Sequence, residues 1–376
     1  MKKIVLHIAE ASGGVERYLK TLLTKIKKYE DIQHILVCST SYDRKKFEGL
    51  VNTLVVIEEM HNSISFVHDS RAILAVRRVI KKYNPDIIYC HSSKAGAIGR
   101  IANIGIKKKI IYNAHGWSFN IKNLSKKKSF FYVLVEKVLA LFCDRIVCIS
   151  DYERQSAIEH GICKSNKLEV INSGINYNEL ENIQPLSRSS LRIPEDAFIV
   201  GTIGRLTPQK APDVFIKMAS LLKSKINSSF FLIVGDDISD GSVRQETESL
   251  IKKAGLEGSF FITGWVDNPL DYASLFDVAV LLSRWEGFGL VLPEYMYMKK
   301  PIVATNADAI PYVLGNAGFL VDIDDYKKAA EYIISIYEND SIVKKLVDNG
   351  QERVKLFNSQ RTADEHNLLF RELFSN

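Results

Sequence analysis

Two carboxylates flank a glycine-rich loop late in the chain, within Ser-Arg-Trp-Glu-Gly-Phe-Gly-Leu-Val-Leu-Pro-Glu, residues 283–294. The loop follows an apolar run, and Pro293 suits the first turn of a helix. Glu286 lies on this loop, whose backbone amides over 288–290 can cradle phosphate or sugar oxygens. Glu294 lies on the helix, so the two carboxylates can accept hydrogen bonds from hydroxyls on separate parts of one ligand. Helix N-capping alone explains an acidic residue here, but not glycines on both sides of an aromatic.

Two cations lie on an earlier loop of the same kind. The segment Gly-Thr-Ile-Gly-Arg-Leu-Thr-Pro-Gln-Lys, residues 201–210, runs from an apolar strand into a loop that precedes a helix. Arg205 can grip a phosphate with its planar fork and Lys210 can add a point charge, so the pair can clamp a diphosphate. The alternative is a pair of solvated surface cations, which is the usual state of a single basic residue.

A third loop of interest follows the first apolar run, in Glu-Ala-Ser-Gly-Gly-Val-Glu, residues 10–16. Gly13 and Gly14 at a strand-to-helix turn allow a backbone to approach a ligand closely, and the helix N-terminus favours an anion. The alternative is simply a tight turn. The segment lacks the G-x-G-x-x-G dinucleotide pattern, and the chain has no P-loop lysine motif, which disfavours a classical dehydrogenase or a P-loop nucleotidase.

Two histidines also come directly after apolar strands. His115 stands in Asn-Ala-His-Gly-Trp, and His91 stands in Cys-His-Ser-Ser-Lys-Ala-Gly. A lone histidine in such a place is often a core residue bonded to a carbonyl. The functional alternative for His91 is that it lines an acceptor pocket, where Lys94 would meet an acceptor phosphate.

The elements that position these loops are short, β-branched apolar runs separated by helical patterns. Nearly continuous apolar strands that alternate with helices indicate parallel sheets buried on both faces, and thirteen strands are too many for one ordinary open sheet. We therefore predict two doubly wound α/β domains, with the ligand at the carboxyl ends of the strands in a cleft where the domains face each other. The thirteen runs are Ile4–Ala9, Ile35–Cys38, Leu54–Ile57, Ile87–Cys90, Ile110–Ala114, Arg145–Ile149, Leu168–Ile171, Ile199–Thr202, Phe230–Val234, Phe260–Thr263, Val278–Leu282, Ile302–Thr305 and Phe319–Val321.

Length and composition agree with this organisation. A chain of 376 residues suits two domains, and 25% charged with 46% hydrophobic residues is the balance of a soluble globular protein. No run approaches the ~18 apolar residues of a membrane-spanning helix. The apolar stretch after Lys3 is too short for a signal peptide, and the five cysteines lack metal-site spacing. We expect a cytoplasmic protein in a reducing compartment. The seam is predicted in the polar stretch 176–194.

The charge is unevenly distributed. Residues 1–185 carry 29 Lys and Arg against 18 Asp and Glu, a net charge of +11, whereas residues 186–376 carry 21 against 26, a net charge of −5. The excess is either ordinary surface variation or the mark of an anionic partner, such as nucleic acid, a phospholipid surface or a phosphorylated substrate. No recognised nucleic-acid-binding module supports the first of these.

A segment that is both basic and apolar bears on contact with a phospholipid surface. Four lysines precede a helical pattern over 129–142, in which one stripe of apolar residues is of the kind that a core takes. Phe130 and Val133 fall outside that stripe, and surplus apolar residues beside a basic cluster are typical of a helix that dips into an anionic leaflet. The alternative, which the helix taken alone favours, is that both of its sides pack against the domain. With the +11 half, we expect peripheral contact with the inner face of the membrane. The lysines are Lys122, Lys126, Lys127 and Lys128, and the stripe is Phe131, Leu134, Val135, Val138, Leu141 and Phe142.

Taken together and in order, these segments resemble the family 4 retaining glycosyltransferases of GT-B fold. The resemblance covers nearly the whole chain. It is carried by Gly13-Gly14, His115, Asn172-Ser-Gly-Ile-Asn176, Gly204-Arg205 with Lys210, Val234-Gly235-Asp236, Phe261-Ile-Thr-Gly264 and the pair Glu286 and Glu294.

The resemblance implies a role for each of these positions. Arg205 and Lys210 would hold the nucleotide diphosphate and stabilise the charge on the leaving group, so that no metal or other cofactor is needed. Glu294 would bind the ribose, and Glu286 would orient the transferred sugar. His115 would contact that sugar near the reacting centre, so that the catalytic set is His115, Glu286, Arg205 and Lys210. The donor-binding set is Gly13, Gly14, Arg205, Lys210, Val266, Glu286, Gly287, Phe288, Gly289, Leu290 and Glu294, with Val266 meeting the base through its backbone.

The resemblance also implies an activity and a partner. We expect an N-terminal acceptor domain over 1–182 and a nucleotide-sugar domain over 183–357, with a final helix over about 358–376 that packs back on the first. The expected reaction is transfer of a sugar, with retention, from a nucleotide donor such as a UDP-sugar to an acceptor hydroxyl. A polyprenyl-diphosphate-linked saccharide in capsule or other cell-surface polysaccharide synthesis is the expected acceptor. Asp322-Ile-Asp324 spells the metal motif of a different glycosyltransferase fold and is interpreted as a polar loop.

Three alternatives stay open on the sequence alone. The first is a soluble GT-B enzyme that makes a small glycoside, and the second is a sugar-nucleotide epimerase of the same architecture. The third is a non-catalytic nucleotide-sugar-binding scaffold, which predicts a broken set of arginine, lysine and glutamates, whereas all four are present.

Overall fold

The chain folds into two compact units. In the computed structural model, which describes residues 2–11, 13–61, 63, 65–122, 124–237 and 240–375, one unit comprises Met1–Asn176 with Phe357–Asn376 and the other Tyr177–Leu356. The chain thus passes from the first unit to the second after Asn176, a few residues before the predicted 182/183 boundary. The reason is that Tyr177 belongs to the second unit, where its hydroxyl donates to the carbonyl of Val354 at 2.8 Å and its ring packs 4.8 Å from that of Tyr297.

The first unit is built on a seven-stranded sheet in the order β3-β2-β1-β4-β5-β6-β7, with every neighbouring pair parallel. Apolar side chains of both sheet and helices form its core, because strands covered by helices on both faces must be apolar throughout. The strands are β1 (Lys3–Ala9), β2 (Ile32–Cys38), β3 (Thr53–Val56), β4 (Ile87–His91), β5 (Lys109–Asn113), β6 (Arg145–Cys148) and β7 (Leu168–Val170). The helices are α1 (Gly14–Ile26), α2 (Phe66–Tyr83), α3 (Ser93–Ala102), α4 (Lys126–Ala140), α5 (Asp151–Glu159) and α14 (Ser359–Ser375).

The second unit has a six-stranded parallel sheet in the order β10-β9-β8-β11-β12-β13 and its own apolar core. Its strands are β8 (Phe198–Ile203), β9 (Ser229–Val234), β10 (Phe260–Ile262), β11 (Val278–Leu281), β12 (Ile302–Thr305) and β13 (Gly318–Val321). Its helices are α6 (Tyr177–Glu181), α7 (Pro212–Lys225), α8 (Ser242–Lys253), α9 (Pro269–Ala273), α10 (Val291–Tyr297), α11 (Ile310–Leu314), α12 (Tyr326–Glu338) and α13 (Asp340–Arg353). Each of the thirteen predicted runs is a strand, and the prediction of two doubly wound α/β domains is confirmed.

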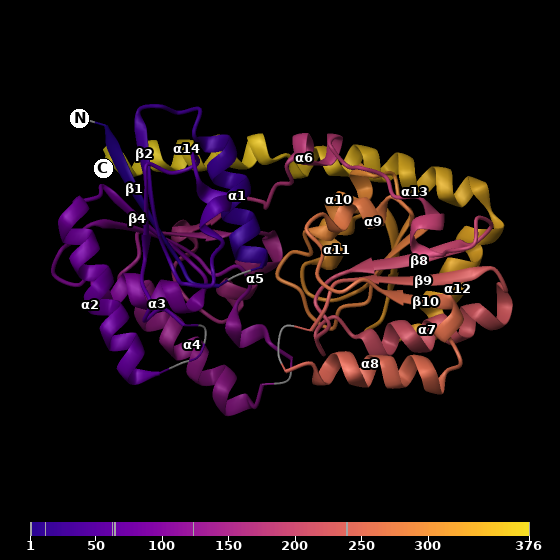
Figure 1. The fold of residues 1–376 in the computed structure, drawn as a ribbon. Coiled ribbons are helices and arrows are strands. Elements are labelled where there is room, and N and C mark those ends of the chain that lie inside the picture. The colour runs from indigo at the N-terminus through magenta and orange to yellow at the C-terminus, as the bar shows by residue number, and fades with distance from the viewer. Residues whose placement is uncertain are drawn as a thin grey trace. The chain divides into compact units, whose positions relative to one another are not determined.

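The last helix returns to the first unit. In Figure 1, α14 at the yellow end of the chain lies beside α1, near the indigo start, and the two helices pack together. The return begins where Ile175 donates its N–H to the carbonyl of Phe357 at 2.8 Å. Gly174 makes this approach possible, because a Cβ at that position would lie 2.5 Å from Cα of Ser359.

The orientation of α4 differs from the sequence prediction. The stripe assigned to a core is largely at the surface, with Phe131 57% and Leu141 77% exposed, whereas Val133, outside it, is buried. The reason is a buried ion pair: Glu136 on α4 lies 3.0 Å from the guanidinium of Arg100, which is fully buried on α3. A charged pair removed from water must stay together, so Glu136 turns inward and the apolar stripe turns outward. In the described part of the chain, no helix has the length and apolar composition needed to cross a bilayer.

Candidate active site

In each unit the candidate residues lie where the strand order reverses. In the first sheet, β1 lies between β2 and β4, so the connections from β1 and β4 leave in opposite directions. In the second sheet the same happens between β8 and β11. Ligands of open α/β sheets bind outside the carboxyl ends of the strands at such points. The loops after β1, β4, β8 and β11 therefore hold the positions at which binding is expected.

In the second unit, the loops after β8 and β11 are tied to each other. The Lys210 ammonium forms an ion pair with Oε1 of Glu286, which also accepts a hydrogen bond from Ser283 Oγ at 3.0 Å. The backbone N–H of Glu286 donates to a carboxylate oxygen of Asp308 at 3.0 Å. The structure thus brings together a predicted diphosphate ligand, Lys210, and a predicted sugar ligand, Glu286, from loops that are 76 residues apart.

Arg284 locks the same two loops. Its guanidinium lies 2.8 Å from carboxylate oxygens of both Asp213, on α7, and Asp324. Its backbone N–H donates to the carbonyl of Gln209 at 2.8 Å. Asp324 lies with Asp322 between β13 and α12, as the interpretation of that segment as a loop requires. Its carboxylate is engaged by an arginine.

Arg205 differs from Lys210 in being exposed. Among the described residues it makes no ion pair, so its fork is open to an incoming anion. Gly204, Arg205 and Lys210 line a hollow whose floor is apolar, including Phe215 and Leu282. A cation at the rim of an apolar hollow is well placed for a ligand with one charged end.

The ends of β8, β9 and β10 converge beside this hollow. The backbone N–H of Gly204 donates to the carbonyl of Val234, and Gly235 bridges to Gly264. A Cβ at Gly235, whose φ is 141°, would lie 2.1 Å from the carbonyl oxygen of Gly204, so only glycine fits there. Val266 follows this convergence on the loop after β10 and is partly buried.

The glycine-rich loop after β11 leads directly into α10. Gly289 has a φ of 79°, and Leu281 and Leu292 lie within 3.4 Å of where its Cβ would be. Gly287 and Leu290 are partly buried, whereas Phe288 is buried and fixes the loop to the core. Glu294 is 2% exposed in the first turn of α10, where the helix dipole favours a negative charge.

In the first unit, Gly13 and Gly14 begin α1. Gly13 is the N-cap residue with a φ of 79°, and no side chain among the described residues caps the helix. No heavy atom lies within 4 Å of a Cβ built on either glycine, so the backbone there is open to approach.

His115 follows β5 in a strained backbone conformation, with a φ of 53°. The side chain of Asn113 stabilises this turn by accepting the N–H of His115 at 3.0 Å. The buried carboxylate of Glu153 accepts the next N–H, from Gly116, and that of Ile149 at 2.9 Å. A residue held in a sparsely populated conformation by several partners is typical of functional sites.

His91, at the end of β4, is hydrogen-bonded to His115, with Nδ1 and Nε2 of the two rings 3.2 Å apart. The structure therefore brings these two predicted residues together. His91 is fully buried, which places it behind His115 rather than at a surface that an acceptor can reach.

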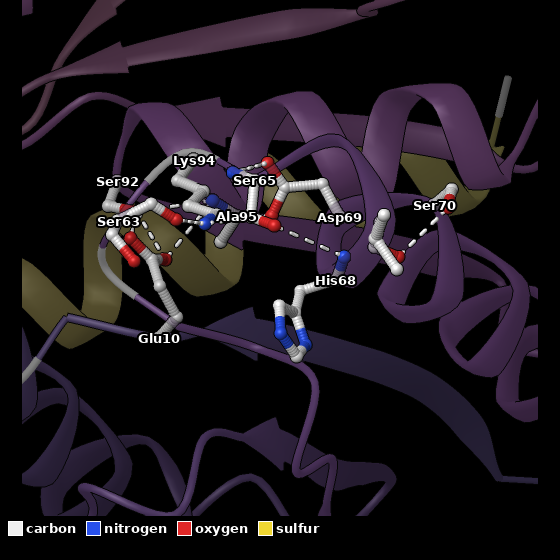
Figure 2. Close-up of polar contacts among 10 residues, drawn as sticks. Glu10, Ser63, Ser65, His68, Asp69, Ser70, Ser92, Lys94 and Ala95 are labelled. Carbon is white, nitrogen blue, oxygen red and sulfur yellow. Dashed lines mark hydrogen bonds and ion pairs between the residues drawn. The ribbon is translucent and has the colours of Figure 1, made fainter.

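Lys94 lies close to His91 in sequence but has its own partners. Its ammonium is 2.8 Å from the carboxylate of Asp69 and donates to the carbonyl of Ser63, as Figure 2 shows. In the same view the carboxylate of Glu10 accepts hydrogen bonds from Ser92 Oγ and from the N–H of Ala95, at the start of α3. Any acceptor phosphate would have to compete with Asp69 for Lys94.

Several residues that shape this region carry no motif in the sequence. They are the buried carboxylates Glu10 and Glu153, the loop residue Asp308, and the histidines His7 and His34. The two histidines had a weak signal, since His7 interrupts an apolar run and His34 directly precedes one. Among the described residues, no group of three or more His, Cys, Asp or Glu side chains is arranged to hold a metal ion.

Glu153 gives the turn after His115 a dependence on pH. Burial raises the pKa of Glu153 from 4.5 to about 7, so over that range the folded protein keeps a proton that the unfolded chain releases. The contribution of protonated Glu153 to the free energy of unfolding is complete below pH 4.5 and is lost as pH rises through about 7. We predict that the unfolding free energy of wild type, relative to Glu153→Gln, falls between pH 5 and pH 8 in urea titrations. A difference that grows with pH would instead show that the two N–H donors keep the carboxylate ionised.

Comparison with known families assigns both units. The family model described as Glycosyltransferase Family 4 matches residues 12–179, and the one described as Glycosyl transferases group 1 matches residues 184–353. A capsular polysaccharide biosynthesis glycosyltransferase, CapM of Staphylococcus aureus, is 27% identical over 96% of this chain and 95% of that protein. The Escherichia coli UDP-Gal:alpha-D-GlcNAc-diphosphoundecaprenol alpha-1,3-galactosyltransferase is 26% identical over 84% of this chain and 82% of that protein.

Solved structures agree on the fold. Sucrose-phosphate synthase from Thermosynechococcus elongatus superposes with a TM-score of 0.84 at 21% identity, covering 100% of both chains. Anabaena HepE in complex with UDP-glucose gives a TM-score of 0.81 at 19% identity, covering 98% of this chain and 99% of that one. The chain, with a family 4 domain followed by a group 1 domain, belongs to the GT-B glycosyltransferases of family 4.

Proposed function

We propose that the protein transfers a sugar, with retention and without a metal ion, from a UDP-sugar to a hydroxyl of a polyprenyl-diphosphate-linked saccharide during cell-surface polysaccharide assembly. The observation that carries the proposal is the clustering of Arg205, Lys210 and Glu286, with Glu294 on the adjoining helix, at the ends of the paired strands β8 and β11. The names of the capsule and diphosphoundecaprenol relatives support the acceptor class, and the UDP-glucose complex of HepE supports the donor class.

In this proposal, different residues of the second unit bind different parts of the nucleotide-sugar donor. Arg205, exposed at the rim, grips the diphosphate with its fork, and Lys210 adds a second positive charge. Glu286 has two roles: it holds Lys210 in place and accepts a hydrogen bond from a sugar hydroxyl. The amides of the following loop support the sugar. Glu294 accepts hydrogen bonds from the two ribose hydroxyls, and the backbone near Val266 meets the base.

In the proposed reaction, the bond between the anomeric carbon and the diphosphate oxygen breaks, and the bond to the acceptor oxygen forms on the same face of the sugar. The proton of the acceptor hydroxyl passes to an oxygen of the departing phosphate. Negative charge therefore builds on the diphosphate in the transition state, where Arg205 and Lys210 stabilise it more than in the ground state. These two cations take the place that a metal ion occupies in other transferases.

The donor assignment is tested by binding. We expect one nucleotide class from a panel of nucleotide sugars to bind saturably in EDTA, and Glu294→Ala to weaken binding by about tenfold to a hundredfold, because a buried acceptor for two hydroxyls is lost. Calorimetry on the full chain measures this, with Glu257→Ala at an exposed site as the control. Loss of all binding in EDTA, restored by Mg²⁺, would contradict the metal-free proposal. Release of a modified sugar nucleotide without an acceptor would identify an epimerase instead.

The diphosphate clamp is tested by turnover. Lys210→Ala and Arg205→Ala should each lower kcat by about 10²–10³, because each removes a charge that acts on the transition state. The matched control is Lys225→Ala, at an exposed end of α7 in the same unit. Steady-state kinetics with the donor found above gives the result. Full activity in either clamp variant would remove that residue from the proposed site.

The membrane partner is argued from the surface of α4. The exposed apolar side chains on α4 and at its C-cap include Phe130, 69% exposed, and Leu141, 77% exposed. The exposed lysines Lys126, Lys127 and Lys128 lie in the first turn of the helix. Apolar side chains beside a basic cluster match the boundary between acyl chains and anionic headgroups. We propose that this surface rests on the anionic inner leaflet, where a lipid-linked acceptor is anchored.

Sedimentation with lipid vesicles tests this. We expect the full chain to bind vesicles that contain phosphatidylglycerol, to bind neutral phosphatidylcholine vesicles far less, and to lose binding as salt is raised. Phe131→Ser with Leu134→Ser should lower the bound fraction several-fold without loss of stability, because both side chains are already exposed. Leu368→Ser, at an exposed position of α14, is the control. Equal binding by all variants would exclude α4 as the contact.

A further inference from the structure

Four histidines form a hydrogen-bonded row across the first sheet. Nδ1 of His34 lies 3.0 Å from Nε2 of His7, Nδ1 of His7 lies 3.2 Å from Nε2 of His91, and Nδ1 of His91 lies 3.2 Å from Nε2 of His115. The row follows the strand order β2, β1, β4, β5, with His115 just past the end of β5. Every contact joins Nδ1 of one ring to Nε2 of the next, so the two ends of the row differ.

Three of the four rings are buried, whereas His115, at one end of the row, is partly exposed. His7 and His91 are fully buried, and His34 is 2% exposed. Two tyrosines pack on it: the ring of Tyr89 lies 4.0 Å from that of His91, and Tyr18 meets His115 edge-on at 4.5 Å.

The hydroxyls of these tyrosines point away from the row, towards His366. They lie 2.9 Å (Tyr89) and 3.0 Å (Tyr18) from Nε2 of His366. The other nitrogen of that ring donates to the carbonyl of Thr362 at 2.7 Å, so Nε2 accepts. Nε2 has a single lone pair, so it accepts from one of the two hydroxyls at a time, and the tyrosines share this fixed acceptor.

Burial keeps the rings neutral. It lowers the pKa of His7 and His91 well below the usual value, that of His34 to about 4 and that of His115 to about 3. A neutral imidazole has one N–H and one acceptor nitrogen, so each ring donates to one neighbour and accepts from the other. All three hydrogen bonds must therefore run in the same direction, and the position of one proton fixes the others.

The buried end of the row decides the direction. Nε2 of His34 is buried and has no hydrogen-bond partner among the described residues. If the bonds ran from His115 towards His34, this atom would be an N–H donor with nothing to donate to, which is among the rarest states of a buried polar group. In the opposite direction it is only an unused lone pair.

We propose that His34, His7 and His91 act as a relay that fixes the tautomer and orientation of His115, with each ring donating from Nδ1 so that His115 carries its proton on Nδ1 and offers it outward. The three are positioning residues, because none of them need touch a ligand. The inference rests on the proposed function for its consequence: His115 donates a hydrogen bond to an oxygen of the transferred sugar instead of accepting one. Asn113 and Glu153 hold the backbone of the same residue from the other side.

The tautomer is read directly by NMR of the full chain labelled with ¹⁵N-histidine. The chain has eight histidines, and loss of one set of signals in His115→Gln assigns that ring. We expect His115 to carry a proton on Nδ1 and a lone pair on Nε2. A proton on Nε2 of His115, or on both of its nitrogens, would overturn the proposal.

Two substitutions of His7 test the coupling. His7→Phe keeps a ring but breaks the row, so His115 should no longer show a single tautomer, and kcat should fall on the order of tenfold or more with KM within about twofold. His7→Asn keeps a donor close to the position of Nδ1 and should restore both the tautomer and kcat. His61→Phe, at an exposed histidine, is the control.

An unchanged tautomer and kcat in His7→Phe, or a His7→Asn variant as slow as His7→Phe, would overturn the relay. The NMR result does not depend on turnover. A chain with the expected tautomer that transfers no sugar from any nucleotide donor would keep the relay and exclude the proposed function.

Discussion

The parallel pairing of β8 with β11 is the constraint on which the candidate site depends. Its register sets Gly201 opposite Ala279, and it fits only because Gly201 lacks a side chain: a Cβ there would lie 2.1 Å from the ring of Phe276. A slip in register would separate the loops that follow the two strands, because side chains and loop positions move with the strand. The contact between Lys210 and Glu286, and the bond from Arg284 to the carbonyl of Gln209, both follow from this pairing. The first unit repeats the logic with β1, β4 and β5, whose adjacent ends bring His91 to His115.

Much of this organisation could be predicted from the sequence, because the pattern that marks a buried strand lies within the strand itself. Strands buried on both faces must be apolar throughout, so each of the thirteen runs was visible without any tertiary information. The loops after them were visible because glycines and charges follow directly on apolar runs. What could not be predicted is which loops meet. The ion pair of Lys94 with Asp69 joins the start of α3 to α2, and the histidine row joins four strands, so neither has a spacing in the sequence that reveals it.

The orientation of α4 shows how one buried polar group can override a pattern. A stripe of large apolar residues predicts a buried face, and a glutamate predicts an exposed one. Here Arg100 lies fully buried on α3 with its guanidinium 3.9 Å above the ring of Tyr112, and both it and the Tyr112 hydroxyl, at 2.8 Å, hydrogen-bond to Glu136. Leaving that arginine without its carboxylate would cost about 3–5 kcal/mol, because a buried charge would be left unpaired. The surface of the first unit thus depends on a charge pair in its interior.

The return of α14 has a consequence for the order in which the protein is made. Nε2 of its residue His366 lies within hydrogen-bond distance of the hydroxyls of both Tyr18 and Tyr89, and the helix packs on α1. A ribosome synthesises all of the second unit before it reaches Ser359, the start of this helix. The first unit therefore waits, with its tyrosines and part of one sheet face uncovered, while a complete second unit folds behind it. Chaperone dependence during synthesis should accordingly centre on the N-terminal unit, although it emerges first.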